Sequence, residues 1–214
     1  LGWGKILFNR LFDWGYFTDP EPQFDGREVE CARGRVIGGS SSINAMGYVR
    51  GNREDYDRWS RQGCTGWSYA ECLPYFRKAE GWEKGNDDYR GADGPLTTIE
   101  NKYPDPLLQA WLEAGEAAGY PTTPDYNGAQ NEGLGVFQST IRNGRRCSAA
   151  VAYLRPALSR PNLTLISKAL AHRVVMEGTK AVGIEYSTGG NSTTVARAER
   201  AVILSGGVIN SPQL

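Results

Sequence analysis

The sequence has 214 residues, of which 40% are hydrophobic and 22% are charged, a composition typical of a globular chain that buries a core in one or two domains. Its 24 basic and 24 acidic residues cancel, so neither nucleic acid nor an anionic membrane surface is expected as a partner. No apolar run approaches the roughly 20 residues that an integral membrane span needs.

The first of three predicted zones, residues 1–63, is rich in glycine and arginine. Its most informative stretch is Gly-Gly-Ser-Ser-Ser at 38–42, because paired glycines let a backbone approach a ligand closely while amides and hydroxyls donate to an anion. A pyrophosphate or the edge of a flavin would suit this loop, and a glycine-serine loop without any ligand is an equally good interpretation. The polar residues from Asn52 to Arg61 predict a short helix.

The second zone, residues 64–160, is aromatic and punctuated by proline. Ser68 and Glu71 have the spacing of a capping box, which predicts a helix start. Asp105 followed by proline predicts a second helix that ends at Gly119. A third helix is expected from residue 148 toward residue 158.

The third zone, residues 161–214, changes to short β-type runs. Strands are expected at 163–166, 174–176, 182–186, 193–196 and 201–204. The first four lie close together and favour an antiparallel meander. The last is continuously apolar, as in a strand covered on both faces, and leads through Ser205 and two glycines to a helix start at Ser211 and Pro212.

A longer pattern surrounds the glycine-serine loop. The sequence at 34–44, Gly-Arg-x-Ile-Gly-Gly-Ser-Ser-x-Ile-Asn, followed by Tyr48, Gly51 and Asp57, resembles throughout the first signature of the glucose-methanol-choline (GMC) FAD-dependent oxidoreductases. So many fixed positions rarely coincide.

Further segments extend this resemblance over essentially the whole chain. Residues 207–214 are similar to the start of the family's second signature, with Val208 where a small residue is usual, and residues 90–96 and 148–154 resemble the choline-dehydrogenase branch. The resemblance implies a mixed α/β (α+β) fold. In it, residues 1–63 and 161–214 belong to the FAD-binding part, and residues 64–160 belong to the substrate domain.

The resemblance also implies the cofactor contacts. The loop at 38–42 would lie along the FAD pyrophosphate, Asn44 would reach the flavin end, and the main chain at Ala171 would meet adenine. Some relatives join a histidine at position 43 covalently to the flavin, so Ile43 implies non-covalent FAD. The implied cofactor-binding residues are Arg35, Gly38, Gly39, Ser40, Ser41, Ile43, Asn44, Ala45, Ala171, Ser205 and Gly206.

Two expected parts of such an enzyme are not in this sequence. The Gly-x-Gly-x-x-Gly element that opens dinucleotide binding is missing, and the stretch at 133–138 lacks its third glycine and is interpreted as a loop entering a strand. The family's catalytic pair, a histidine with a second histidine or an asparagine, is also missing. We therefore expect an internal fragment without N- and C-terminal parts of the enzyme, and assign no catalytic residue.

Other residue groups favour structural interpretations. His172, the single histidine, falls in a predicted strand, where a structural or surface role is favoured. The aromatic residues Tyr48, Trp59, Trp67 and Trp111 are expected to pack in the core. Arg142, Arg145 and Arg146 are expected in a solvated turn, with an acidic partner as the lesser alternative.

Metal binding has poor support, because four cysteines without a C-x-x-C pair and one histidine make a weak zinc set. The cysteines are interpreted as reduced thiols. The expected location is the cytoplasm, with peripheral attachment to the inner membrane as an alternative.

The resemblance implies FAD-dependent oxidation of a small-molecule primary alcohol, choline-like or another aliphatic or aromatic alcohol, with a base outside this chain. Oxygen, a quinone or a dye would accept the electrons. The alternatives are a lyase acting on cyanohydrins, a light-driven fatty-acid decarboxylase, both of which keep FAD on this scaffold, and an inactive fragment.

Overall fold

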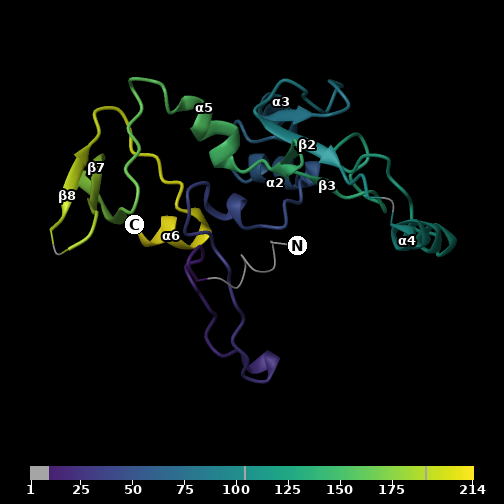
Figure 1. Cartoon of the computed structure of the whole chain (residues 1–214), viewed down its shortest axis with the longest axis horizontal. Helices are drawn as coiled ribbons and strands as arrows, with labels where there is room; N and C mark the ends of the chain where they lie inside the picture. Colours follow the sequence, from purple (N-terminus) through teal and green to yellow (C-terminus); the bar gives the residue numbers. More distant parts are fainter. Residues whose placement is uncertain (1–9, 104, 191) are drawn as a thin grey trace. The chain divides into compact units, whose positions relative to one another are not determined.

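The structure, a computed structural model, describes residues 10–103, 105–190 and 192–214. The chain divides into two compact units, Leu1–Ser159 (unit 1) and Arg160–Leu214 (unit 2). Figure 1 gives the order of the elements along the chain.

Unit 1 begins with a two-armed ribbon that leads into the predicted loop. Its tip is the short helix η1 (Pro22–Phe24), and the arms run side by side in Figure 1. The Asp13 carboxylate, 3% exposed, accepts hydrogen bonds from the N–H groups of Gly15 (2.6 Å) and Arg33 (2.7 Å). Isolated bridges join Asp13 to Gly34, Phe17 to Glu30, and Glu21 to Arg27. The second arm then enters the 3-10 helix η2 (Gly39–Ser42).

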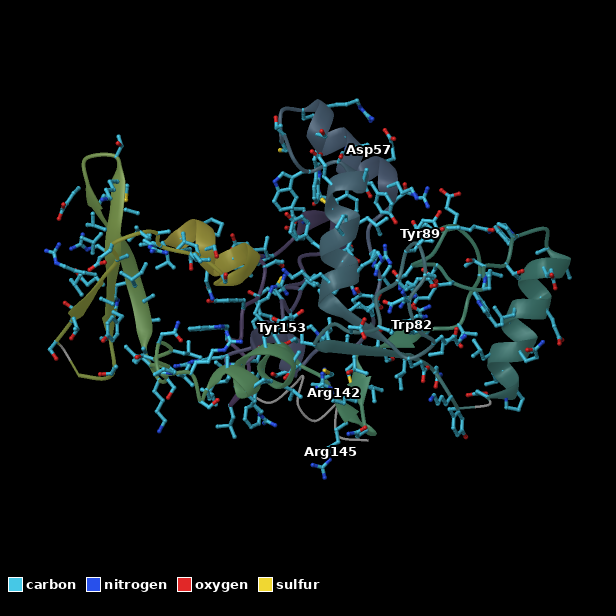
Figure 2. The ribbon with its side chains drawn as sticks, turned by 90° about the horizontal axis from the view of Figure 1, so that it is seen from above. Asp57, Trp82, Tyr89, Arg142, Arg145 and Tyr153 are labelled. Atoms are coloured by element: carbon cyan, nitrogen blue, oxygen red, sulfur yellow. The ribbon has the colours of Figure 1, made fainter. Side chains whose placement is uncertain are left out.

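Three predicted helices of unit 1 are confirmed. They are α2 (Arg53–Arg61), α3 (Tyr69–Ala79) and α4 (Pro106–Ala117). Two of them, α3 and α4, were predicted from their caps. Asn52 caps α2 by accepting from the Glu54 N–H, and Asp105 caps α4 by accepting from the Leu107 N–H. Asp57, labelled in Figure 2, ties α2 to α3 by accepting from the Tyr69 N–H at 2.9 Å.

A small mixed sheet follows the helix pair. Strand β1 (Glu80–Trp82) runs parallel to β2 (Leu96–Glu100), which is antiparallel to β3 (Gln138–Ser139). The stretch at 133–137 is a loop that enters β3, as predicted.

The hairpin of β4 (Ile141–Arg142) and β5 (Arg145–Arg146) turns at Asn143 and Gly144, both with positive φ, as an Asn-Gly turn requires. The expected third helix is present as a π-helix, η3 (Ala150–Leu154), continued by α5 (Arg155–Ala157).

Unit 2 contains the expected antiparallel meander. Its strands are β6 (Leu170–Glu177), β7 (Lys180–Ser187) and β8 (Thr194–Arg197), in the order β6-β7-β8. The register shifts between Ala171 and Arg173, so that His172 is the extra residue of a bulge on β6. The predicted strands at 174–176, 182–186 and 193–196 are therefore confirmed, although β6 begins four residues earlier than predicted and β7 is longer than predicted at both ends.

Three predictions in unit 2 are wrong. Residues 163–166 and 201–204 form no strand, because no other described strand pairs with them, and Ile203 is 84% exposed. Helix α6 (Gly207–Gln213) begins at Gly207 rather than at Ser211, and Pro212 lies inside it. The valine and isoleucine after Gly207 continue the helix, so proline here does not mark its first turn.

The apolar side chains also correct one expectation. Trp59, Trp67 and Trp111 are 41%, 55% and 64% exposed, so the prediction that they pack in the core is wrong. Tyr48 is half-buried, and burial raises its pKa.

Within the described ranges, no helix is long and apolar enough to cross a membrane.

Candidate functional site

The glycine-serine loop, residues 38–45, places its two glycines on opposite faces. Gly38 (φ +94°) points inward, because an added Cβ would lie 2.5 Å from Ser42 Oγ and 3.1 Å from Ala150 Cβ. Gly39 (φ +56°) points outward, and an added Cβ there would meet nothing within 4 Å. The left-handed φ favours glycine at both positions. The loop therefore presents bare main chain on one face.

One side of this loop rests against the second arm of the ribbon. The Gly34 N–H donates to Ser40 Oγ at 3.0 Å. A Cβ on Gly34 would lie 2.4 Å from the carbonyl carbon of Gly39, so the two backbones are in direct contact. This contact explains why the pattern at 34–44 has a glycine at its first position.

The other side is anchored by residues 146–150. Ser41 Oγ donates to the Gly38 carbonyl (2.5 Å) and accepts from the Ala149 N–H (2.9 Å). Arg146 Nη1 donates to the Ser41 carbonyl (3.1 Å) and to Asn44 Oδ1 (2.7 Å). Burial lowers the pKa of Arg146, although a guanidinium stays charged at neutral pH. The loop is thus held by a segment about a hundred residues away in sequence.

The three neighbouring arginines do not form one solvated turn, which corrects that expectation. Arg142 Nε donates to Thr97 Oγ1 at 2.9 Å, and its Nη2 donates to the Pro95 carbonyl. Arg146 bonds to the loop. Only Arg145 is exposed at the end of the hairpin, and Figure 2 shows it pointing away from the ribbon.

The remaining predicted contact residues differ in accessibility. Ser40, Asn44 and Ala45 are exposed, whereas Ile43 is 2% exposed and packs inside unit 1. Arg35 is exposed, with its guanidinium 5.0 Å from the centre of the Trp14 ring. Unit 1 thus brings residues 38–45 together with one another and with Arg146, which sequence reasoning had not assigned to the site.

Three predicted contact residues belong to unit 2. Ala171 pairs with Tyr186 on the edge strand β6 and is exposed. Ser205 and Gly206 are exposed and directly precede α6, a helix of seven residues. His172 lies in β6, as predicted, and its Nε2 is 2.9 Å from Ser187 Oγ.

Two cavities of unit 1 lie away from this loop. One is lined by α3 and by residues around Gly91 and Gly94, and the other by Trp111, Tyr126 and Phe137 among others. Neither is lined by a residue of the glycine-serine loop. In the described residues, the outer face of the loop at Gly39 is an open surface.

A buried polar network that the sequence did not reveal lies beside β1 and β2. Its centre is the Glu80 carboxylate, which accepts from Arg50 Nη2 (2.6 Å), Arg90 Nη2 (2.5 Å) and Thr98 Oγ1 (2.6 Å). Glu80, Arg90 and Thr98 are 0% exposed. The members of the network are Arg50, Glu80, Arg90, Thr98, Asp125, Asn127 and Gln138.

Arg90 connects the two halves of this network. Its Nη1 donates to both Asp125 carboxylate oxygens (2.7 and 2.8 Å) and to Gln138 Oε1 (3.0 Å), and its guanidinium lies 3.9 Å from the centre of the Trp82 ring. Burial acts to lower the pKa of Arg90, but the hydrogen bonds and charges of Glu80 and Asp125 outweigh it and raise that pKa. Such pairing is what a buried charge requires.

Close packing of the backbone beside the network explains the two glycines in the sequence at 90–96. A Cβ on Gly91 would lie 1.8 Å from the Arg77 carbonyl oxygen, and one on Gly94 would lie 2.4 Å from the backbone of Glu80. These glycines let the 90–96 segment pack against α3 and β1. Arg50 Nε is the single buried side-chain nitrogen or oxygen among the described residues without a hydrogen-bond partner. The hydrogen-bonding groups of the network are therefore almost fully satisfied.

The groups that surround the glycine-serine loop suit the binding and orienting of a ligand rather than proton transfer. They are main-chain amides, serine hydroxyls, the Asn44 amide and the Arg146 guanidinium. Together they suit an anionic or hydrogen-bond-accepting ligand lying flat on the Gly39 face.

The family follows from comparison with known proteins. The family model described as GMC oxidoreductase matches residues 16–214, so the chain belongs to this family, which is FAD-dependent. Among its relatives is the human mitochondrial choline dehydrogenase, 57% identical over 208 residues that make up 97% of this chain and 35% of that protein. The oxygen-dependent choline dehydrogenase of Brucella anthropi is 51% identical over 203 residues, 95% of this chain and 37% of that protein.

Solved structures agree with the fold. Pyridoxine 4-oxidase from Mesorbium loti superposes with a TM-score of 0.91 at 33% identity, over 99% of this chain and 42% of that chain. An FAD-dependent oxidoreductase from Chaetomium thermophilum superposes with a TM-score of 0.89 at 29% identity, over 97% and 38%. The expected mixed α/β fold of the family is confirmed over this partial length, and the chain spans about a third of the choline dehydrogenases that it matches.

Proposed function

We propose that this chain supplies the glycine-serine loop and part of the substrate domain of an enzyme that oxidises a small-molecule primary alcohol with non-covalent FAD. The observation that supports it most is the outward face of Gly39, where bare main chain meets open space between two anchored sides. The names of the relatives favour choline or a choline-like alcohol as the substrate.

The proposed division of labour follows the three sequence zones. Residues 1–63 and 161–214 contribute to FAD binding, and residues 64–160 to the substrate domain. Ile43 has no nucleophilic atom, and its side chain is buried, which supports a flavin held without a covalent bond. The proposed FAD contacts are Arg35, Gly38, Gly39, Ser40, Ser41, Ile43, Asn44, Ala45, Ala171, Ser205 and Gly206.

FAD, when bound, supplies an acceptor for the hydride of the alcohol. The residues of this chain bind and orient: Gly39 gives access to the main chain, and the exposed Ser40 and Asn44 side chains provide polar groups beside it. The proposal assigns the base that takes the hydroxyl proton to a histidine outside these 214 residues. Oxygen, a quinone or a dye then accepts the electrons.

A chimera tests this function. The matched segment of human choline dehydrogenase is replaced by residues of this chain, and the product is purified beside the unmodified human enzyme. We expect a yellow protein with about one flavin per chain, flavin released by denaturation, and choline oxidation with a dye acceptor. A chimera that folds by circular dichroism but holds no flavin contradicts the proposal, and flavin that stays attached after denaturation contradicts its non-covalent part.

A Gly39→Val substitution provides the control within the same chimera. We expect flavin to be lost, because the Val side chain would occupy the face on which the cofactor lies. The 214-residue chain alone is expected to retain little or no FAD, since it has no Gly-x-Gly-x-x-Gly element. Unchanged flavin content in the Gly39→Val chimera would contradict the assignment of the loop.

A further inference from the structure

The Asn44 side chain is oriented by two donors. Its Oδ1 accepts from the Met46 N–H at 3.0 Å and from Arg146 Nη1 at 2.7 Å. The oxygen and nitrogen of a carboxamide are normally assigned from their partners, and here both partners can only donate. The oxygen must therefore face Arg146 and Met46, which turns the Nδ2 amide toward the other side of an exposed residue.

The backbone next to Arg146 is held in place by burial and by a hydrogen bond to the loop. The two residues that follow it, Cys147 and Ser148, are 1% and 5% exposed, and the Ala149 N–H is bonded to Ser41 Oγ in the loop. The same guanidinium nitrogen that bonds to Asn44 also bonds to the Ser41 carbonyl. One charged group thus fixes both a main-chain and a side-chain position of the loop.

We propose that Arg146 is a positioning residue that presents Asn44 as a hydrogen-bond donor, so that the ligand atom meeting Asn44 is an acceptor of the flavin ring system. This inference rests on the proposed function, because it takes FAD as the ligand. A bond from a cation to the amide oxygen also polarises the amide, which strengthens its N–H groups as donors.

The substitution Asn44→Asp separates a donor role from a merely structural one. Aspartate has the same shape, keeps its acceptor for Arg146 and Met46, and gains an ion pair with Arg146, so the loop without ligand stays folded. It replaces the Nδ2 donor by a second acceptor. In the chimera we expect FAD to bind at least about tenfold more weakly, while the melting temperature without FAD is unchanged or higher. Unchanged FAD affinity would overturn the donor role.

Arginine substitutions test the positioning role. We expect Arg146→Ala to weaken FAD binding about tenfold, and Arg146→Lys to recover part of that loss because it keeps the charge without the planar fork. Arg145→Ala is the matched control, since Arg145 is exposed on the same strand, and its effect should stay below about twofold. Equal affinities for the Arg146→Ala and Arg145→Ala chimeras would overturn the positioning role.

A measurement without FAD distinguishes failure of this inference from failure of the proposed function. In the 214-residue chain with labelled asparagine, the Nδ2 proton resonances of Asn44 should shift in Arg146→Ala and stay in place in Arg145→Ala. If the chimera holds no flavin but this shift occurs, the contact stands and the flavin assignment falls. If the resonances do not move, the contact between Arg146 and Asn44 is refuted.

Discussion

The buried polar network and the glycine-serine loop are both built from polar groups of unit 1, but they satisfy those groups differently. In the network, the Glu80 carboxylate and the Arg90 guanidinium find their partners within the chain, at 0% exposure. In the loop, the exposed Asn44 side chain accepts hydrogen bonds at its Oδ1 and leaves its Nδ2 amide for a ligand, and Gly39 opens to solvent. Polar groups that are all hydrogen-bonded within the chain indicate a structural role, whereas exposed polar groups with hydrogen-bonding capacity left over can bind a ligand.

The largest loss of stability should come from removing the carboxylate at the centre of the buried polar network. Glu80→Gln keeps the shape of the side chain but leaves Arg50 and Arg90 buried without their shared carboxylate. We expect the free energy of unfolding to fall by about 3–5 kcal/mol, as when one partner of a buried pair is removed. Urea denaturation measures this change.

An exposed ion pair provides the control for Glu80→Gln. Glu54 and Arg61 are 67% and 60% exposed, so Glu54→Gln should cost at most about 1 kcal/mol. If the two variants lost the same stability, burial would not explain the cost of removing a charge from the network. The contrast between the network and the loop would then fail.

The next prediction compares alanine substitutions at Gly91, which packs beside the network, and at Gly39 in the loop. In Gly91→Ala the new Cβ would lie 1.8 Å from the Arg77 carbonyl oxygen, so the backbone must shift, at a cost of about 3 kcal/mol. In Gly39→Ala the Cβ meets open space, and only the left-handed φ costs about 1 kcal/mol.

Thermal unfolding and flavin content together measure this contrast. We expect Gly91→Ala to lower the melting temperature more, and Gly39→Ala to lower the flavin content of the folded chimera more. A reversed order of the two melting temperatures would show that the Gly39 face is covered in solution and is no open surface.

The sequence predicted what depends on near neighbours. The helices at Tyr69 and Pro106 were expected because their caps lie within three residues of the groups they satisfy. The glycines at 38 and 39 were also recognisable from the sequence, and the left-handed φ that both adopt is a local property that favours glycine. Local chemistry was sufficient at these places.

Partners distant in sequence were not predictable in this way. Glu80 meets Arg50, thirty residues away, and Arg146 meets Asn44, 102 residues away, and no spacing rule relates such positions. The prediction of a strand at 201–204 was wrong for a related reason. β-propensity describes a fit to neighbouring strands, and no strand among the described residues pairs with this run. Of the network, only Arg90 fell in a segment that the sequence had singled out, residues 90–96.

The prediction with the smallest expected effect tests whether mutual hydrogen bonding stabilises the fold when the bonded groups are exposed. The capping box of α3 is also a closed set of bonds: Glu71 Oε2 accepts from Ser68 Oγ (2.6 Å) and from the Ser68 N–H (3.0 Å). It lies in water, however. The Ser68 hydroxyl, and then its backbone amide, lower the pKa of Glu71 below its usual value.

The sign of the pH effect follows from this shift. Because the pKa of Glu71 is lower in the folded chain than in the unfolded one, its contribution to stability is complete above the unfolded pKa and is lost as pH falls through the folded pKa. Ser68→Ala should raise the pKa of Glu71, measured by NMR titration, and should remove this part of the acid sensitivity. Ser68→Thr keeps a hydroxyl and should keep the lowered pKa. Since solvent competes for every group of the capping box, its loss should cost less than either change above. A loss as large as that of Glu80→Gln would mean that closure rather than burial determines how much a polar cluster stabilises this fold.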